Sequence, residues 1–228
     1  MTQWHIAVDG EATSAIFEPA ARDGGDLVFV CAHGAGGHMR DRGMQSLAEA
    51  LRSRGVTVVR FNFLYREQGA RRPDAMPRLK ACMTGVIDHV RKAVNPRTLV
   101  IGGRSMGGRT ASMLAADGLP CNGLLLFAYP LHPAGKPERL RDAHLSQVSV
   151  PVLCLNGTRD ALCSRDLMER VVASLGSNWE MQWLEGADHA FHVLKSSGRT
   201  DADVLNEAAD TSARWLFRPG RPVAEWDL

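Results

Sequence analysis

A lone serine stands between glycines in the stretch "LVIGGRSMGGR", residues 99–109. Residues Gly103 to Gly107 fit the pattern G-x-S-x-G, which lifts a serine onto a sharp turn between a strand and a helix. An apolar run precedes the pattern and a helical pattern follows it, so both flanks suit such a turn. We therefore predict that Ser105 is a nucleophile, and the alternative is a serine that only caps the following helix.

Two further residue types must reach the serine before its hydroxyl can react. A histidine takes the proton, and a carboxylate orients the histidine. In one recurrent order along the chain, the acid and then the histidine follow the serine. The loop "NGTRDALC" supplies Asp160, which we prefer to Asp166 because Asp166 lies where a helix is expected to begin. The loop "GADHAFH" supplies His189, which we prefer to His192 because it is nearer to the strand end.

Acyl transfer through a serine also needs N–H donors for the oxyanion that forms on the substrate. The residue after the nucleophile, Met106, offers one backbone N–H at the start of the predicted helix. The loop "HGAGG" (33–37) follows an earlier apolar strand, and its flexible backbone is free to aim a second N–H. We predict Ala35 as this second donor, with Gly36 as the other choice.

Residues near the expected mouth of this site bear on what the substrate carries. Six arginines gather there: Arg40, Arg42, Arg66, Arg71, Arg72 and Arg104. A basic rim would favour an anionic ester, while the alternative is ordinary solvated surface, or an Arg104 that packs against neighbouring loops. Arg104 is predicted to bind substrate, together with Tyr129 and His132, which follow a strand end. The alternative for Tyr129 and His132 is that they are core and turn residues.

Strand-like and helix-like patterns alternate around these residues. An alternating edge strand (4–8) precedes near-continuous apolar runs at 27–33, 56–63, 97–103, 121–129 and 150–157 and a mixed strand at 179–186. Helical patterns lie at 44–55, 77–93, 106–118, 164–176 and 203–217. Strands that are apolar throughout are buried on both faces, as in a parallel sheet covered by helices. The alternation predicts an α/β fold with a mostly parallel central sheet flanked by helices.

Length and composition suit a single globular domain over residues 1–228. The chain is 45% hydrophobic, and its 27 Lys+Arg nearly balance its 25 Asp+Glu. This balance gives no case for a nucleic-acid partner, and no apolar run approaches the roughly 18–20 residues of a membrane span. The N-terminus lacks the pattern of a signal peptide. The five cysteines fit neither a disulfide framework nor a zinc site, which favours a reducing cytoplasm. The oligomeric state is left open.

Taken together, these motifs resemble those of the α/β-hydrolase superfamily. The chain is most similar to small, dienelactone-hydrolase-like bacterial serine hydrolases, in a branch whose relatives include a subunit of an animal histone-acetyltransferase complex. The matching stretches are "HGAGG", "GGRSMGGR", "YPLHPAGKPERLR", "NGTRDALC", "GADHAFHVLKSSGRT" and the closing helix, and they span nearly the whole chain. The resemblance implies Ser105 as nucleophile, Asp160 as acid and His189 as base. Dienelactone hydrolases proper use a cysteine where this chain has Ser105, so their reaction is not implied.

The expected function is that of a serine hydrolase that cleaves a small or exposed ester without a cofactor or a metal. Only about 20 residues separate Tyr129 from Val150, where many lipases insert a helical lid, so we expect no large lid. The same residues also permit a thioesterase or a perhydrolase, or a non-catalytic interaction module that keeps the fold.

Overall fold

Eight strands form one sheet in the computed structural model, which describes residues 1–22 and 26–219, so that residues 220–228 of the predicted domain lie outside it. The strands are β1 (Thr2–Val8), β2 (Glu11–Glu18), β3 (Leu27–Ala32), β4 (Thr57–Phe61), β5 (Thr98–Arg104), β6 (Gly123–Phe127), β7 (Val152–Gly157) and β8 (Trp179–Leu184). Their order in the sheet is β1-β2-β4-β3-β5-β6-β7-β8. β2 pairs antiparallel with β1 and β4, and all other neighbours are parallel. The predicted mostly parallel sheet is confirmed.

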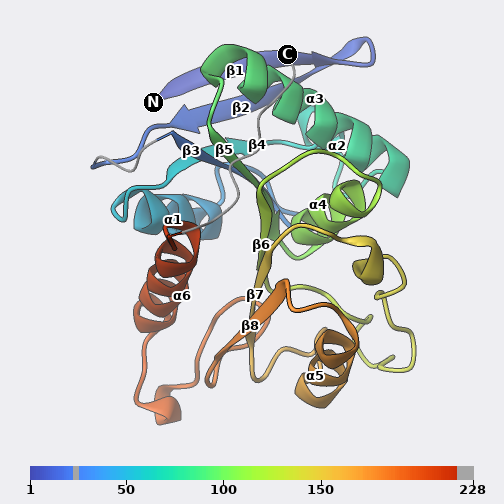
Figure 1. The fold of residues 1–228 in the computed structure, drawn as a ribbon, viewed down its shortest axis with the longest axis vertical. Coiled ribbons are helices and arrows are strands. Elements are labelled where there is room, and N and C mark those ends of the chain that lie inside the picture. Colours follow the sequence, from blue (N-terminus) through green and yellow to red (C-terminus); the bar gives the residue numbers. More distant parts are fainter. Residues whose placement is uncertain (23–25, 220–228) are drawn as a thin grey trace.

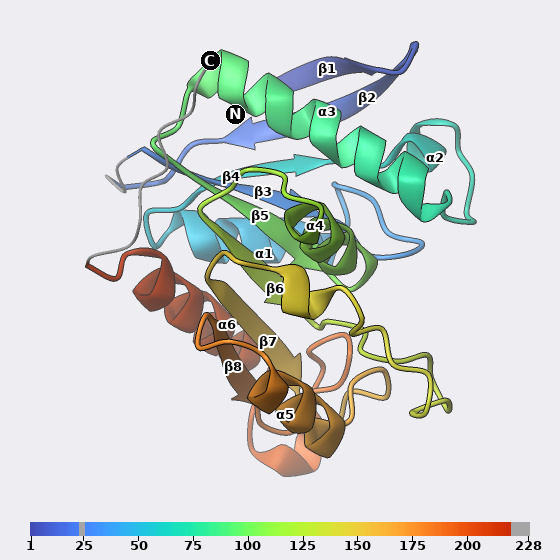
Figure 2. The same ribbon diagram turned by 45° about the vertical axis from the view of Figure 1, so that its right-hand side comes forward.

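Helices cover both faces of this sheet (Figure 1). They are α1 (Arg42–Arg52), α2 (Leu64–Glu67), α3 (Met76–Val94), α4 (Met106–Ala116), α5 (Arg165–Ser174) and α6 (Asp201–Leu216). Apolar residues of α1 and α6 belong to one core cluster, and those of α3, α4 and α5 belong to another. The turned view in Figure 2 shows the two groups of helices on opposite sides of the sheet. The predicted flanking by helices is therefore confirmed.

Each central strand contributes to both core clusters. On β3, Val28 and Val30 belong to the cluster that includes α3 and α4, whereas Phe29 and Cys31 belong to the cluster that includes α1 and α6. Successive side chains of a strand point to opposite faces, so a strand covered on both faces is apolar at every position. This explains the near-continuous apolar runs of the sequence. All five cysteines are buried free thiols, as small core residues often are.

The antiparallel edge of the sheet is larger than the sequence patterns predict. The edge strand expected at 4–8 lies within β1, but none of the apolar runs or alternating patterns in the sequence predicts β2. Asp9 and Gly10 form the turn between the two strands, with φ angles of 48° and 82°. A two-residue turn with positive φ at both positions matches the twist of a hairpin, and Asp-Gly favours this turn.

The described part of the chain carries no large insertion over the carboxyl ends of the parallel strands. Between β6 and β7, residues 128–151 form turns and one short 3-10 helix, η1 (Leu145–Gln147). The expectation of a fold without a large lid is therefore confirmed. None of the described helices combines the length and the apolar character needed to cross a bilayer.

Candidate active site

The turn at Ser105 depends on glycines that no other residue could replace without a clash. Ser105 stands between the last residue of β5 and the first residue of α4, with φ of 48° and ψ of −113°. Such angles are rare for a residue with a side chain and are held only when the surroundings fix them. A Cβ atom on Gly103 would lie 2.1 Å from the Ala32 carbonyl oxygen, and one on Gly107 would lie 2.6 Å from it. The glycines therefore let β5 and α4 press against β3, and this packing holds the strained serine.

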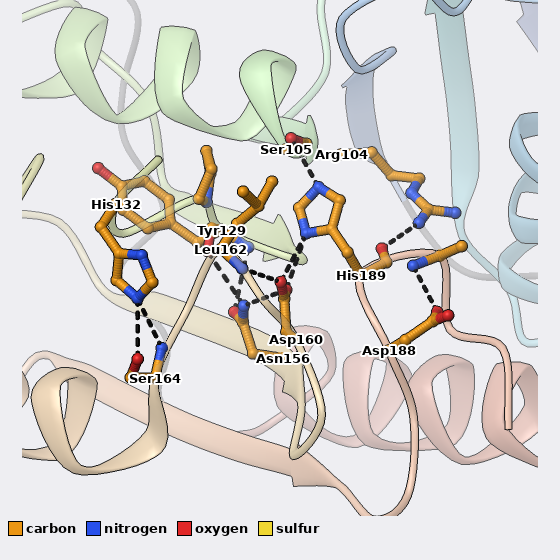
Figure 3. A network of polar contacts seen from close by, with 12 residues as sticks. Arg104, Ser105, Tyr129, His132, Asn156, Asp160, Leu162, Ser164, Asp188 and His189 are labelled. Carbon is orange, nitrogen blue, oxygen red and sulfur yellow. Dashed lines mark hydrogen bonds and ion pairs between the residues drawn. The ribbon is translucent and has the colours of Figure 1, made fainter. Parts of the chain in front are cut away.

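A chain of hydrogen bonds joins Ser105, His189 and Asp160 (Figure 3). His189 Nε2 lies 2.9 Å from Ser105 Oγ, and His189 Nδ1 lies 2.8 Å from Asp160 Oδ2 and 3.0 Å from Oδ1. The carboxylate favours the tautomer with the proton on Nδ1, so Nε2 is left to accept the hydroxyl proton of Ser105. The three residues come from the loops after β5, β7 and β8, which meet at one edge of the parallel sheet. The structure thus brings together the three residues that the sequence singles out.

Asp160 is held in place by two further donors. Its side chain is buried, and its carboxylate accepts hydrogen bonds from the Leu162 N–H at 2.8 Å and from Asn156 Nδ2 at 3.2 Å. Asn156 also donates to the Tyr129 carbonyl and accepts from the Tyr129 N–H, so it ties the acid loop to the end of β6. Sequence reasoning missed this role of Asn156. The available signal was an amide side chain at the end of an otherwise apolar strand.

The loop that carries His189 is fixed from both sides. The Asp188 carboxylate accepts from the Ala190 N–H at 2.8 Å, which closes a tight turn around the histidine. Arg104 Nη2 donates to the His189 carbonyl at 2.7 Å, and its guanidinium lies 5.1 Å from the centre of the Phe191 ring. These contacts set the position of the imidazole without using its ring nitrogens.

The alternative acid and base lie elsewhere. Asp166 is exposed in the first turn of α5, where a carboxylate suits the positive end of the helix. His192 points to Asp201 at the start of α6, with Nδ1 2.9 Å from the carboxylate. This hydrogen bond raises the pKa of His192. Neither residue takes part in the contacts at Ser105.

A cavity of about 380 Å³ opens in front of Ser105, and Ala35 and His189 lie on its wall. Ala35 lines this cavity and Gly36 does not, so the position of Ala35 favours it as the second oxyanion donor. Met106 is the first residue of α4, and its N–H is therefore among those that find no acceptor within the helix. Of the two predicted oxyanion donors, Ala35 thus lies on the cavity wall, and Met106 directly follows Ser105 at the start of α4.

His33 supports the loop that carries Ala35. Its Nδ1 lies 2.8 Å from the Gly34 carbonyl and its Nε2 accepts the Phe63 N–H at 3.2 Å, so both ring nitrogens are engaged. The Gly34 carbonyl also accepts the Gly37 N–H at 3.1 Å, which closes the turn. Burial lowers the pKa of His33 to about 4, so the ring is neutral near pH 7.

Tyr129 and His132 lie away from the cavity at Ser105, although the sequence favours a place for them in the pocket. Tyr129 is fully buried and its hydroxyl donates to the Arg141 carbonyl at 2.9 Å. His132 is also buried, and its Nε2 accepts the Ser164 N–H at 3.0 Å. Both side chains turn into the protein because the segment after β6 packs beneath the acid loop. They act as core and turn residues, and neither lines the cavity at Ser105.

Fewer arginines line the cavities near Ser105 than the sequence suggests. Arg104 lines the cavity at Ser105, and Arg104 and Arg42 line a neighbouring one. Arg40 donates instead to Gln3 on β1 and lines a separate cavity at that edge of the sheet.

The sheet order and the strand–turn–helix at Ser105 are those of the α/β-hydrolase class. The sequence model described as "Alpha/beta hydrolase domain" matches residues 25–217, and the chain belongs to this family. The match covers every element that contributes to the site.

Solved bacterial structures share this fold. An alpha-beta serine hydrolase homologue from Coxiella burnetii has a TM-score of 0.77 at 22% identity, covering 94% of this chain and 97% of that one. A serine hydrolase without a lid from Xanthomonas campestris has a TM-score of 0.74 at 21% identity, covering 97% and 96%. A dienelactone hydrolase from Anabaena variabilis has a TM-score of 0.72 at 17% identity, covering 94% and 96%. At these identities the similarity is one of fold.

Proposed function

We propose that this protein is a serine hydrolase that cleaves a small or exposed ester through an acyl-enzyme on Ser105. The observation that carries the proposal is the continuous hydrogen-bond chain from Ser105 through His189 to the buried Asp160, which begins at an open cavity. An arrangement of this kind makes a hydroxyl nucleophilic by giving its proton a place to go.

We assign a residue of the site to each step of the reaction. Ser105 Oγ attacks the ester carbonyl carbon while His189 Nε2 takes its proton, and Asp160 stabilises the imidazolium that forms. The carbonyl oxygen becomes an oxyanion held by the N–H groups of Met106 and Ala35. The imidazolium then protonates the leaving alcohol, which leaves an acyl group on Ser105. A water molecule, deprotonated by His189, attacks this acyl group and releases the acid.

The open approach to the serine supports a small or exposed substrate. No large insertion covers the cavity in the described residues, and its wall includes the apolar side chains of Met44 and Leu162. The similar structure from Xanthomonas campestris is also described as lacking a lid.

The buried free thiols suit a reducing compartment, and we place the enzyme in the cytoplasm on this ground.

Hydrolysis of 4-nitrophenyl acetate by the wild type and by Ser105→Ala, His189→Ala and Ser174→Ala tests the proposal. Ser174 lies on α5, where its hydroxyl donates to the Val171 carbonyl, so Ser174→Ala is a matched control that should keep full activity. We expect Ser105→Ala and His189→Ala each to lower kcat/KM by at least about 10³-fold. Turnover by Ser105→Ala at the wild-type rate would contradict the proposal.

A further inference from the structure

A second cavity adjoins the one at Ser105. It has a volume of about 450 Å³ and lies between the start of α1, the start of α6 and the loop of His189. The two cavities share Gly43 and Arg104 on their walls, so they meet at these residues. A substrate whose carbonyl carbon lies at Ser105 could therefore extend past Gly43 into the second cavity.

Arg104 brings a positive charge to this junction. Its Nη2 donates a hydrogen bond to the His189 carbonyl. Its Nη1 faces Gly43, and a Cβ atom added to Gly43 would lie 3.6 Å from this Nη1. Burial lowers the pKa of Arg104, yet an arginine stays charged near pH 7. Its Nη1 therefore offers N–H donors beside the path that a substrate would follow.

Arg42 adds a second cation on the wall of the same cavity. It is exposed, as the first residue of α1, and the free N–H groups of a helix start also favour a negative charge. The ion pairs of the described residues include neither Arg42 nor Arg104. Among the described residues, neither guanidinium is therefore ion-paired with a carboxylate, and Asp160 and Asp188 act on Arg104 only from a longer distance.

The carboxylates on these walls are already engaged. Asp41 accepts the His38 N–H at 2.7 Å and lies 3.0 Å from the His38 ring. Asp201 accepts from the Val193 N–H at 3.0 Å and pairs with the His192 ring at 2.9 Å. The two arginines supply the cationic donors on the wall of the second cavity.

We propose that the natural substrate is an ester with a carboxylate in its acyl or alcohol part, bound in the second cavity by Arg104 and Arg42. This inference rests on the proposed esterase function and names its substrate class. A carboxylate between two guanidinium groups forms charge-assisted hydrogen bonds, which are stronger than neutral ones. Such a contact selects a substrate by charge, at a distance from the bond that is cleaved.

Two matched pairs of esters test the inference. Monomethyl succinate against methyl butyrate places the charge on the acyl side, and 3-acetoxybenzoate against phenyl acetate places it on the alcohol side. The ratio of kcat/KM, charged over neutral, is measured by pH-stat titration for each pair. We expect this ratio to exceed one in at least one pair for the wild type.

Three variants show whether the arginines cause the preference. Arg42→Gln removes one cation of the second cavity, and we expect it to lower the preferred ratio about tenfold or more. Gly43→Val keeps both arginines but fills the junction, and it should lower the same ratio. Arg97→Gln is the matched control, because Arg97 is exposed just before β5, at the opposite end of the strand from Arg104. It should leave the ratio as it is in the wild type.

The possible failures are distinguishable. Hydrolysis of both members of each pair with no preference for the charged ester would overturn the inference and leave the esterase proposal standing. Equal changes in ratio for Arg42→Gln and Arg97→Gln would also overturn it, because net charge alone would then explain the preference. Failure to hydrolyse any of the four esters would count against the esterase function and against this inference with it.

Discussion

At the scale of single residues, the hydroxyl of Ser105 depends on groups that it does not touch. Asp160 contacts only the far side of the imidazole, yet it selects the tautomer that leaves Nε2 free. Asn156 and the Leu162 N–H in turn hold Asp160. In the proposed reaction, the reactivity of the serine therefore depends on this whole set.

Asp160→Asn keeps the shape of the side chain and removes its charge. The amide can hold the imidazole in the wrong tautomer and cannot stabilise the imidazolium, so we expect kcat for ester hydrolysis to fall by about 10³- to 10⁴-fold. Steady-state kinetics measures this fall in kcat. The matched control is Asp166→Asn, because Asp166 is an exposed residue of α5. An Asp160→Asn enzyme within a few-fold of wild type would show that Asp160 is not the orienting acid.

His33 makes stability depend on pH. Its pKa is about 4 in the folded protein, against about 6.5 when unfolded, so the unfolded state binds more protons between these values. We expect the free energy of unfolding to fall as the pH falls from about 6.5 to 4, by up to about 1.4 kcal/mol per pH unit from this residue. NMR titration of the imidazole signals and urea unfolding at several pH values measure both effects. A ring that takes up its proton near pH 6.5 would refute this account of His33.

At the scale of elements, the site is made by close packing of β3, β5 and α4. The two glycines around the serine turn allow contacts with β3 that a Cβ atom would block. A glycine inside a helix normally costs stability, so its presence near the start of α4 reflects this packing rather than helix propensity.

Gly107→Ala and Gly85→Ala make the same chemical change in two helices. At Gly107 the new Cβ meets the Ala32 backbone at 2.6 Å, whereas at Gly85, within α3, it meets only the Cγ2 tip of Val8 at 2.8 Å. We expect Gly107→Ala to lower the free energy of unfolding by about 2–3 kcal/mol. Gly85→Ala should lower it by less, because the close contact is with one side-chain methyl group rather than with backbone atoms, and alanine favours the helix. Urea denaturation compares the two, and equal effects would argue against the packing explanation.

The sequence predicts the parallel elements well because their burial leaves a strong pattern. The strand expected at 27–33 is observed as Leu27–Ala32, and the helix expected at 77–93 as Met76–Val94. The second strand, β2, mixes polar and apolar residues on both of its faces and leaves no comparable run, although the Asp-Gly turn before it was a usable signal.

The site could be predicted only where a residue type has a specific chemical role. Ser105 and His189 stand in short motifs, and each motif follows a predicted strand. The motifs therefore predict that both residues lie beyond the carboxyl ends of those strands. Tyr129 and His132 also follow a strand, but the sequence does not tell whether a side chain there points to the cavity or into the core. Burial of the segment after β6 decides this, and such packing depends on residues far apart in the chain.

At the scale of the whole molecule, the α/β-hydrolase fold presents its site at the open edge of the sheet. The helices cover the faces of the sheet, and the described residues place no large insertion over the carboxyl ends of the strands (Figures 1 and 2). Substrate can therefore approach Ser105 from solvent. An acyl chain too long for the cavity at Ser105 and the adjoining one would extend into water.

A series of 4-nitrophenyl esters with acyl chains of increasing length tests this openness. Without a lid, methylene groups that extend beyond the two cavities remain in water and add little binding energy, so we expect kcat/KM to be highest for shorter acyl chains and to fall for long ones. The same series on a lidded lipase provides the comparison. A steady rise in kcat/KM with chain length would mean that the protein encloses the acyl chain.

Labelling with a fluorophosphonate probe tests most directly the claim that Ser105 is an activated nucleophile. Such a probe reacts with an activated serine, so the test needs no knowledge of the substrate. Peptide mass spectrometry then locates the label in the wild type, in Ser105→Ala and in His189→Ala. We expect a covalent label on Ser105 of the wild type and no label in either variant. A folded wild-type protein without label, or one labelled at another serine, would contradict the claim and favour a binding module that retains the α/β-hydrolase fold.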